Sequence, residues 1–258
     1  MKKDGLLVTF LGVGEACDER LPNTSVLIQP QNKETGSLLL DCGFTVPASF
    51  FAYNQDPEDL SAIWISHFHG DHFFGLPLLL LRLYEEGRRA PLVLLGPEGL
   101  KDKVKALQEL AYPGTWNKLG YEVKFEELRP DEELKWDKVH LKTALSKHPV
   151  QSLGLGVYVG NKILYYSGDG LSSEKGLELA KGSDLVIHES HQFDKETASH
   201  GSVLQSIKFA KSAQAAHLAL VHMQRNVRRG ELEKIEREIE QEREVQVFLP
   251  RPGDKILI

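Results

Sequence analysis

Three histidines and one aspartate fall within six consecutive positions, His67 to His72, in the stretch SHFHGDHFFG. The segment before them, residues 60–65 (LSAIWI), is short, apolar and contains β-branched side chains, which indicates a buried strand. The segment after them, residues 73–87, is long and apolar enough to form a helix packed against a core. The sequence therefore predicts a cluster of titratable side chains where a buried strand passes into a helix.

The order of the other segments predicts two packed sheets with helices on their outer faces. Strand-like runs dominate the first part, and strands alternate with helices in the second half, an order typical of layered α/β proteins. Further strands are expected at residues 6–13, 24–30, 37–43, 91–97, 121–128, 140–148, 154–160, 162–168, 184–190, 217–223, 245–250 and 255–258, and further helices at 98–111, 173–182, 202–213 and 231–243. With 258 residues, 41% hydrophobic and 26% charged, the chain is expected to form one domain over 1–258.

Targeting signals and cysteines favour a cytoplasmic protein. Arg82 interrupts the apolar run PLLLLRLY, well short of the ~18 residues that a membrane helix needs. The first residues, MKKDGLLVTFLGVGE, lack the cleavage site of a signal peptide and resemble a first strand. Cys17 and Cys42 form no disulfide framework and are expected to be free thiols in a reducing compartment.

The charge balance argues against a protein whose whole surface binds nucleic acid, because the formal net charge is −6. The best candidate for a local basic patch is formed by Arg225, Arg228 and Arg229 in MQRNVRRG. The simpler interpretation of these arginines is charge on a solvated loop.

Polar residues at the ends of five predicted strands suggest a metal site. Besides the cluster at 67–72, His148, Asp169, Glu189 and His222 each stand at or next to a strand end. A strand end holds a side chain more rigidly than a loop tip does, as a metal site requires. Histidine nitrogens and carboxylate oxygens suit Zn²⁺, with Mn²⁺ or Fe²⁺ as alternatives.

The candidate ligands are too many for one tetrahedral ion. There are seven of them: His67, His69, Asp71, His72, His148, Asp169 and His222. Two divalent ions that share a bridging group fit this number better, and a hydroxide between them would be the nucleophile. Such a site needs no serine or cysteine nucleophile.

The segment His67-Phe68-His69-Gly70-Asp71-His72 resembles the HxHxDH signature of the metallo-β-lactamase fold, and the downstream candidates follow in that fold's order. The resemblance covers nearly the whole chain. It implies a single hydrolase domain, a four-layer αββα sandwich of two mixed β-sheets flanked by helices. It also implies a division of the ligands: His67, His69 and His148 on one ion, Asp71, His72 and His222 on the other, and Asp169 between them.

Shorter segments resemble the ribonuclease Z-like phosphodiesterase branch of that fold. They are FLGVGEACDERLPNTSVLI, LLLDCG, HPVQSLGLGV, LVIHES and the SHGS around His200. In that branch the histidine of the last motif is a general acid held by a glutamate. The resemblance therefore implies His200 as the acid and Glu189 as its orienting group, with Asp71 as a further catalytic residue. Such an acid is chemically reasonable, because the leaving oxygen of a phosphodiester departs poorly until it is protonated.

Two features depart from that branch. Ser199 replaces the glycine that precedes the acid histidine. Transfer-RNA enzymes of the branch also carry a long protruding arm between the third and fourth motifs, whereas His148 and Asp169 are only 21 positions apart here. The span holds two strands and a turn, so we expect a hydrolytic site without the arm.

Function is predicted at three levels of preference. The leading prediction is a dinuclear-metal phosphodiesterase acting on RNA or a small nucleotide, with a homodimer as the assembly that the resemblance suggests. The alternative is hydrolysis of a thioester, lactone or lactam on the same scaffold, and the least favoured is a non-catalytic, metal-bearing binding module.

The remaining candidates carry weaker predictions. Asp41 either orients a metal-bound histidine or only ends a strand. His188 should point away from the site, since it alternates with Glu189 along a strand. His191 either reaches the site or bonds to nearby loops.

Overall fold

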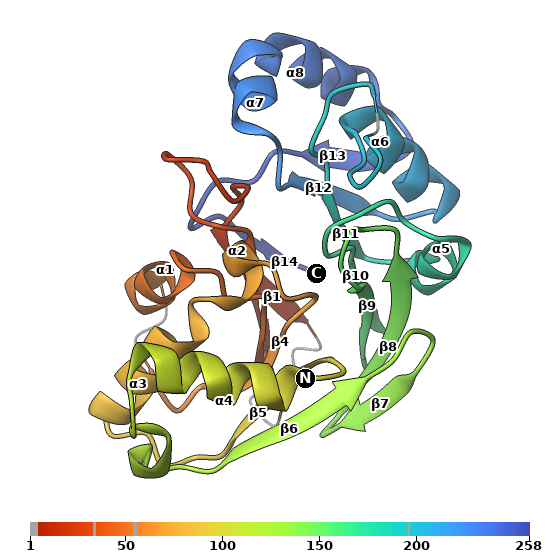
Figure 1. The fold of residues 1–258 in the computed structure, drawn as a ribbon. Coiled ribbons are helices and arrows are strands. Elements are labelled where there is room, and N and C mark those ends of the chain that lie inside the picture. Colours follow the sequence, from red (N-terminus) through yellow and green to blue (C-terminus); the bar gives the residue numbers. More distant parts are fainter. Residues whose placement is uncertain (1–4, 33–34, 54–55, 196) are drawn as a thin grey trace.

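Two mixed seven-stranded sheets packed face to face form the centre of the computed structural model, which describes residues 5–32, 35–53, 56–195 and 197–258 (Figure 1). The first sheet has the order β14-β1-β2-β3-β4-β5-β6. Its strands are β1 (Leu6–Gly12), β2 (Ser25–Pro30), β3 (Ser37–Leu40), β4 (Leu60–Trp64), β5 (Leu92–Pro97), β6 (Val123–Leu128) and β14 (Lys255–Leu257). Strands β3 to β6 run parallel, and the others pair antiparallel.

The second sheet has the order β13-β12-β11-β10-β9-β8-β7. Its strands are β7 (Glu133–Trp136), β8 (Val139–Ser146), β9 (Ser152–Val159), β10 (Lys162–Tyr166), β11 (Leu185–Glu189), β12 (His217–Val221) and β13 (Gln246–Phe248). Strands β10 to β13 run parallel, and β7 to β10 pair antiparallel. The strands β9 and β10 form a simple hairpin, so the span between His148 and Asp169 carries no arm.

Helices cover the outer face of each sheet (Figure 1). The first sheet carries α1 (Val46–Tyr53), α2 (Gly70–Phe73), α3 (Leu76–Glu85), α4 (Leu100–Ala111) and the 3₁₀ turn η1 (Trp116–Lys118). The second carries α5 (Glu174–Ala180), α6 (Val203–Ser212), α7 (Arg225–Gly230) and α8 (Leu232–Gln241). This four-layer arrangement confirms the αββα fold predicted from the sequence.

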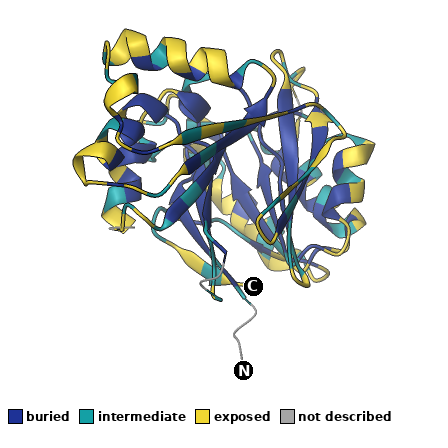
Figure 2. Ribbon diagram, turned by 90° about the horizontal axis from the view of Figure 1, so that it is seen from below, coloured by how far each residue is buried: buried dark blue, intermediate teal, exposed yellow. Residues whose placement is uncertain are grey.

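Alternation along the strands explains the layers. In β2, Val26 and Ile28 pack between the two sheets, whereas Leu27 faces the helices of the first sheet. Because successive strand residues point to opposite faces, a strand buried on both sides must be apolar throughout. The buried strands at the centre and the exposed outer surfaces of the helices are visible in Figure 2.

The apolar segment after the histidine cluster is split rather than continuous. It forms the short helix α2 and the longer α3, in which Leu76, Leu79, Leu80 and Leu83 recur at helical spacing and are fully buried. The chain turns at Gly75, where a Cβ atom would lie 2.1 Å from the carbonyl oxygen of Gly43. The break allows α2 to project its first turn toward the second sheet.

Two further predictions can be compared with the structure. Cys17 is exposed, Cys42 is buried, and neither is in a disulfide. Within the described ranges, no helix combines the length and the apolar character needed to cross a membrane.

Candidate metal centre

Five strand ends bring the seven predicted ligands to one edge of the two sheets. From the first sheet, His67 and His69 follow β4, and Asp71 and His72 lie in α2. From the second sheet, His148, Asp169 and His222 follow β8, β10 and β12. The seven side chains form two groups whose facing nitrogen or oxygen atoms lie within 4.8 Å of one another: a three-histidine cluster (His67, His69, His148) and a mixed cluster (Asp71, His72, Asp169, His222).

The mixed cluster has the spacing of a tetrahedral metal site. The Nε2 atoms of His72 and His222 are 3.4 Å apart, and each lies 3.4 Å from Asp169 Oδ2. Asp71 Oδ2 lies 3.2 Å from His72 Nε2 and 3.1 Å from His222 Nε2. A tetrahedral ion with bonds of ~2.0–2.1 Å needs its ligand atoms roughly 3.3–3.4 Å apart. These atoms are therefore spaced to share one cation.

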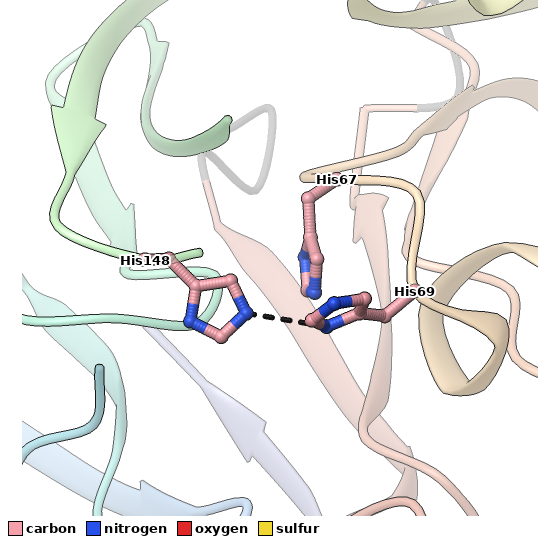
Figure 3. A group of neighbouring side chains, drawn as sticks. All are labelled: His67, His69 and His148. Carbon is pink, nitrogen blue, oxygen red and sulfur yellow. Dashed lines mark hydrogen bonds between the residues drawn. The ribbon is translucent and has the colours of Figure 1, made fainter. Parts of the chain in front are cut away.

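The three-histidine cluster lies beside it (Figure 3). His148 Nε2 is 3.2 Å from His69 Nδ1, and the His67 ring stands 4.8 Å and 5.0 Å from the rings of His69 and His148. His67 Nε2 is buried without a hydrogen-bond partner and lies 3.9 Å from Asp169 Oδ2. An unpartnered buried nitrogen costs free energy unless something binds it. Asp169 stands at the junction of the two clusters.

Hydrogen bonds on the far side of each ring fix its orientation. His148 Nδ1 lies 3.0 Å from the carbonyl oxygen of Ser199, and His72 Nδ1 lies 2.7 Å from Asp41 Oδ2. Because a carbonyl or carboxylate only accepts, each Nδ1 carries the proton, and each Nε2 presents its lone pair to the centre. The residues thus fit a dinuclear metal site.

Asp41 is the hub of this outer network. Its Oδ2 accepts from the hydroxyls of Ser66 at 2.8 Å and Tyr166 at 2.6 Å, and its Oδ1 accepts from the backbone N–H of Ser66 at 2.7 Å. Ser66 Oγ in turn lies 3.0 Å from His67 Nδ1. One carboxylate therefore contacts His72 directly and His67 through Ser66. Ser66 and Tyr166 were missed by the sequence analysis, because nothing in the chain pattern shows which hydroxyls meet Asp41.

The buried charges shift one another's pKa values. Burial opposes ionisation of Asp71, but hydrogen bonds from His222 and His72 outweigh it and hold the pKa of Asp71 far below its usual range. Burial also opposes protonation of His72, yet the carboxylates of Asp169 and Asp41 raise the pKa of that histidine well above its usual value. Burial lowers the pKa of His67, which keeps its Nε2 free of a proton. The negative charge that remains favours cations.

Glu189 and His200 form a pair beside the clusters. His200 Nδ1 lies 3.3 Å from Glu189 Oε1, and a His200 ring nitrogen lies within 4.8 Å of the donor atoms of His148 and Asp169. Glu189 is 1% exposed, and its carboxylate accepts from the backbone N–H groups of Gly170, His191 and Gly201 at 3.2, 3.1 and 2.9 Å. A buried carboxylate held at this many points fixes the imidazole beside it.

Backbone strain marks two of these positions. Asp41 has a φ of 57° and His222 a φ of 53°, a left-handed conformation that non-glycine residues seldom adopt. Such strain persists where surrounding contacts enforce it, often at functional sites. The backbone N–H of His222 donates to the carbonyl of Val13 at 3.0 Å, which ties β12 to the end of the first strand.

The other predicted candidates separate clearly. His191 stacks on His200 with ring centroids 4.5 Å apart, so it reaches the site, and burial together with His200 lowers its pKa to about 4. His188 points to the outer layer instead, where its ring contacts Phe209 on α6. Arg225 pairs with Glu15 at 2.7 Å and Arg229 with Glu19 at 2.6 Å, so neither offers the free positive charge of a basic patch.

Comparison with known proteins agrees with this architecture. The chain is 27% identical to a ribonuclease Z of Methanosarcina mazei, over 84% of this chain and 87% of the relative. It is equally similar, at 27% identity, to a ribonuclease Z of Listeria monocytogenes, over 84% of this chain and 88% of the relative.

Solved structures show the same fold. The metallo-β-lactamase fold protein YhfI from Bacillus subtilis superimposes with a TM-score of 0.80 at 22% identity, covering 98% of this chain and all of that one. The short form of human tRNase Z gives a TM-score of 0.78 at 24% identity, covering 97% of this chain and 98% of that one. The fold predicted from the HxHxDH signature is confirmed.

With the clustered histidines and aspartates, these relatives identify the chain as a metal-dependent hydrolase of the phosphodiesterase type. The family model described as "Anti-Pycsar protein Apyc1" matches residues 6–245, which is nearly the whole chain of 258 residues. The chain therefore belongs to the Anti-Pycsar Apyc1 family.

Proposed function

We propose that this chain hydrolyses the phosphodiester bond of a small nucleotide or short RNA, with His200 as the proton donor to the leaving oxygen. The observation that carries the proposal is the Glu189–His200 pair, 3.3 Å apart and directly beside the two clusters. Hydrolysis of a thioester, lactone or lactam does not need a proton donor of this kind, and the ribonuclease Z relatives do not favour it.

In this proposal the three-histidine cluster holds one divalent cation, the mixed cluster holds a second, and Asp169 contacts both. When bound, such ions polarise phosphoryl oxygens and lower the pKa of water to ~7, which supplies the nucleophile. Zn²⁺ is the proposed ion, since histidine-rich sites with carboxylates suit it. Metal analysis of the purified protein tests this choice against Mn²⁺ and Fe²⁺.

The chain's own residues do the remaining work. Asp71 accepts from His72 and His222 and adds negative charge to the mixed cluster. Glu189 accepts at Nδ1 of His200 and so fixes the tautomer and the ring plane. The opposite nitrogen of the ring is then the position from which a proton reaches the leaving oxygen.

Three features favour a small substrate over a folded RNA. The β9–β10 hairpin replaces a protruding arm, the arginines around Arg225 are neutralised by acids, and the formal net charge is −6. Extended nucleic-acid binding relies on unpaired cations along the phosphate backbone. We also propose that the chain works as one domain over 1–258, as a cytoplasmic protein and as a homodimer; sedimentation would test the assembly.

The experiment compares two leaving groups in the variant His200→Gln. A dinucleotide releases an alkoxide-like oxygen that needs a proton, whereas bis(p-nitrophenyl) phosphate releases a phenolate that leaves without one. Loss of a general acid costs ~10²–10⁴-fold in rate. We therefore expect a kcat loss in that range on the dinucleotide, and a far smaller loss on the p-nitrophenyl ester.

His140→Gln is the matched control, since His140 lies on β8 and pairs with Glu133 away from the clusters. Metal stoichiometry of both variants should equal that of the unmodified protein. Equal losses on the two substrates, or loss of a metal ion from His200→Gln, would remove the general-acid role.

A further inference from the structure

A second cavity lies directly behind the His200 loop. It has a volume of about 250 Å³, lies between α5 and α6, and is lined by residues that include Leu171, Ser172, His188, Gly201 and Phe209. Gly201 forms part of its wall and donates its N–H to Glu189 Oε1 at 2.9 Å. The cavity is therefore one residue away from the proposed proton donor.

This cavity adjoins a larger one at the metal centre. The larger cavity, of about 660 Å³, includes His148 of the three-histidine cluster in its lining. Leu171 and Ser172 line both cavities. A ligand whose phosphate lies at the clusters could thus extend past Leu171 and Ser172 toward α6.

The lining suits an uncharged, planar ring. Phe209 supplies an aromatic surface, and Leu171 and Leu177 supply apolar ones. Ser172, Gln205 and Ser212 supply polar groups at the edges. Pockets of this composition, mostly apolar with a few polar groups, are typical of small-ligand sites, and aromatic side chains are common stacking partners of nucleobases.

His188 gives the cavity a built polar wall. It is 3% exposed, its Nδ1 donates to the carbonyl oxygen of Glu189 at 2.7 Å, and its Nε2 therefore accepts from the hydroxyl of Ser172 at 2.7 Å. The Ser172 oxygen is thereby fixed, with its remaining lone-pair capacity available at the junction of the two cavities. No step of the proposed hydrolysis uses either residue.

We propose that this cavity, which we call the α5–α6 pocket, binds the nucleobase of the substrate next to the phosphodiester. The proposal rests on the proposed function and adds to it a site for the base, with Phe209 as the stacking surface and Ser172 as a polar contact. The pocket is a specificity element and takes no part in bond cleavage.

The test uses two substrates with the same leaving group. The p-nitrophenyl ester of uridine monophosphate carries a base, and methyl p-nitrophenyl phosphate does not. In Ser212→Trp, an indole placed at the exposed end of α6 obstructs the pocket without touching the catalytic loop. We expect KM for the uridine ester to rise about tenfold or more, the scale of a lost stacking contact, and kcat/KM for the methyl ester to stay unchanged.

Leu204→Trp is the matched control, because Leu204 is also an exposed residue of α6 but does not line the pocket. Phe209→Leu is the second variant and should raise KM for the uridine ester alone. Each variant is first checked for an unchanged melting temperature and metal content. Binding of uridine monophosphate, measured by calorimetry, gives a readout that does not depend on turnover.

The outcomes separate the pocket from the proposed function. If neither ester is cleaved but uridine monophosphate binds and Ser212→Trp abolishes that binding, the pocket stands and the hydrolytic proposal fails. If both esters are cleaved and Ser212→Trp changes them equally, or changes neither, the pocket proposal is overturned. Absence of uridine monophosphate binding to the unmodified protein would overturn it as well.

Discussion

Single side chains in this protein act through what lies behind them. The carboxylate of Asp41 is fully buried, and it accepts from His72, Ser66 and Tyr166 at 2.6–2.8 Å. Partners of metal-binding histidines set the tautomer and the ring direction, and their loss weakens metal binding. Because one path is direct and the other runs through Ser66, Asp41 influences both clusters.

The variant Asp41→Asn should therefore lose affinity for both metal ions. An amide cannot accept from three donors at the position of Oδ2, and loss of such a partner costs about 10–100-fold in metal affinity. Ser66→Ala should weaken only the ion at the three-histidine cluster. Competition with a coloured chelator measures the two dissociation constants separately.

Ser183→Ala is the control for Ser66→Ala, since Ser183 is equally buried and its hydroxyl donates to the carbonyl of Ala180 far from the site. Unchanged affinity for both ions in Asp41→Asn would show that the hub is not needed to position the rings.

At the scale of elements, turns at strand ends set the geometry. Periodic apolar segments such as β2 and α3 could be predicted, because burial of their side chains is written into the spacing. The break between α2 and α3 could not, since it depends on the contact of Gly75 with a carbonyl from a distant loop. The exposed edge strand β7 and the short helix α7 lack a long apolar pattern, and the sequence analysis missed both.

The α2–α3 break makes Gly75→Ala a test of how the elements hold Asp71 and His72. The new methyl would lie 2.1 Å from Gly43 O and 2.9 Å from Cys42 O, both backbone atoms that cannot rotate away. Overpacking of this kind costs about 1–3 kcal/mol. We expect the melting temperature to fall by about 3–10 °C and metal affinity to fall with it. Gly230→Ala, where no atom lies within 4 Å, should change neither, and equal behaviour of the two variants would contradict the argument.

The loop that carries His200 gives a second prediction at this scale. Thr197 Oγ1 accepts from the backbone N–H groups of Ser199 and His200 at 3.3 and 3.0 Å. Thr197→Val removes this acceptor from an exposed position, so global stability should change by less than about 0.5 kcal/mol. We expect kcat on a dinucleotide to fall at least about threefold, because a loosened loop misplaces the proton donor. Thr197→Ser should restore it, and failure of serine to do so would assign the effect to side-chain shape.

At the scale of the whole molecule, the site joins the two sheets. The first sheet and α2 supply His67, His69, Asp71 and His72, and the second sheet supplies His148, Asp169 and His222. The sequence predicted this convergence because parallel strands collect their carboxyl ends at one edge. It could not predict the α5–α6 pocket, whose walls come from two helices, a strand and a loop that meet only in the folded chain.

Because bound ions would link residues of both sheets, removal of metal should lower the stability of the entire fold. A ligand at 100 times its dissociation constant adds about 2.7 kcal/mol, and 1 kcal/mol corresponds to about 2–4 °C in a chain of this size class. We therefore expect chelation to lower the melting temperature by about 5–10 °C per ion, in one transition that both sheets share, and Zn²⁺ to restore it. The variant Asp169→Ala should already melt lower and respond less to the chelator, whereas His140→Gln should respond like the unmodified protein. An unchanged melting temperature after metal analysis has verified complete removal would mean that the clusters do not tie the sheets together.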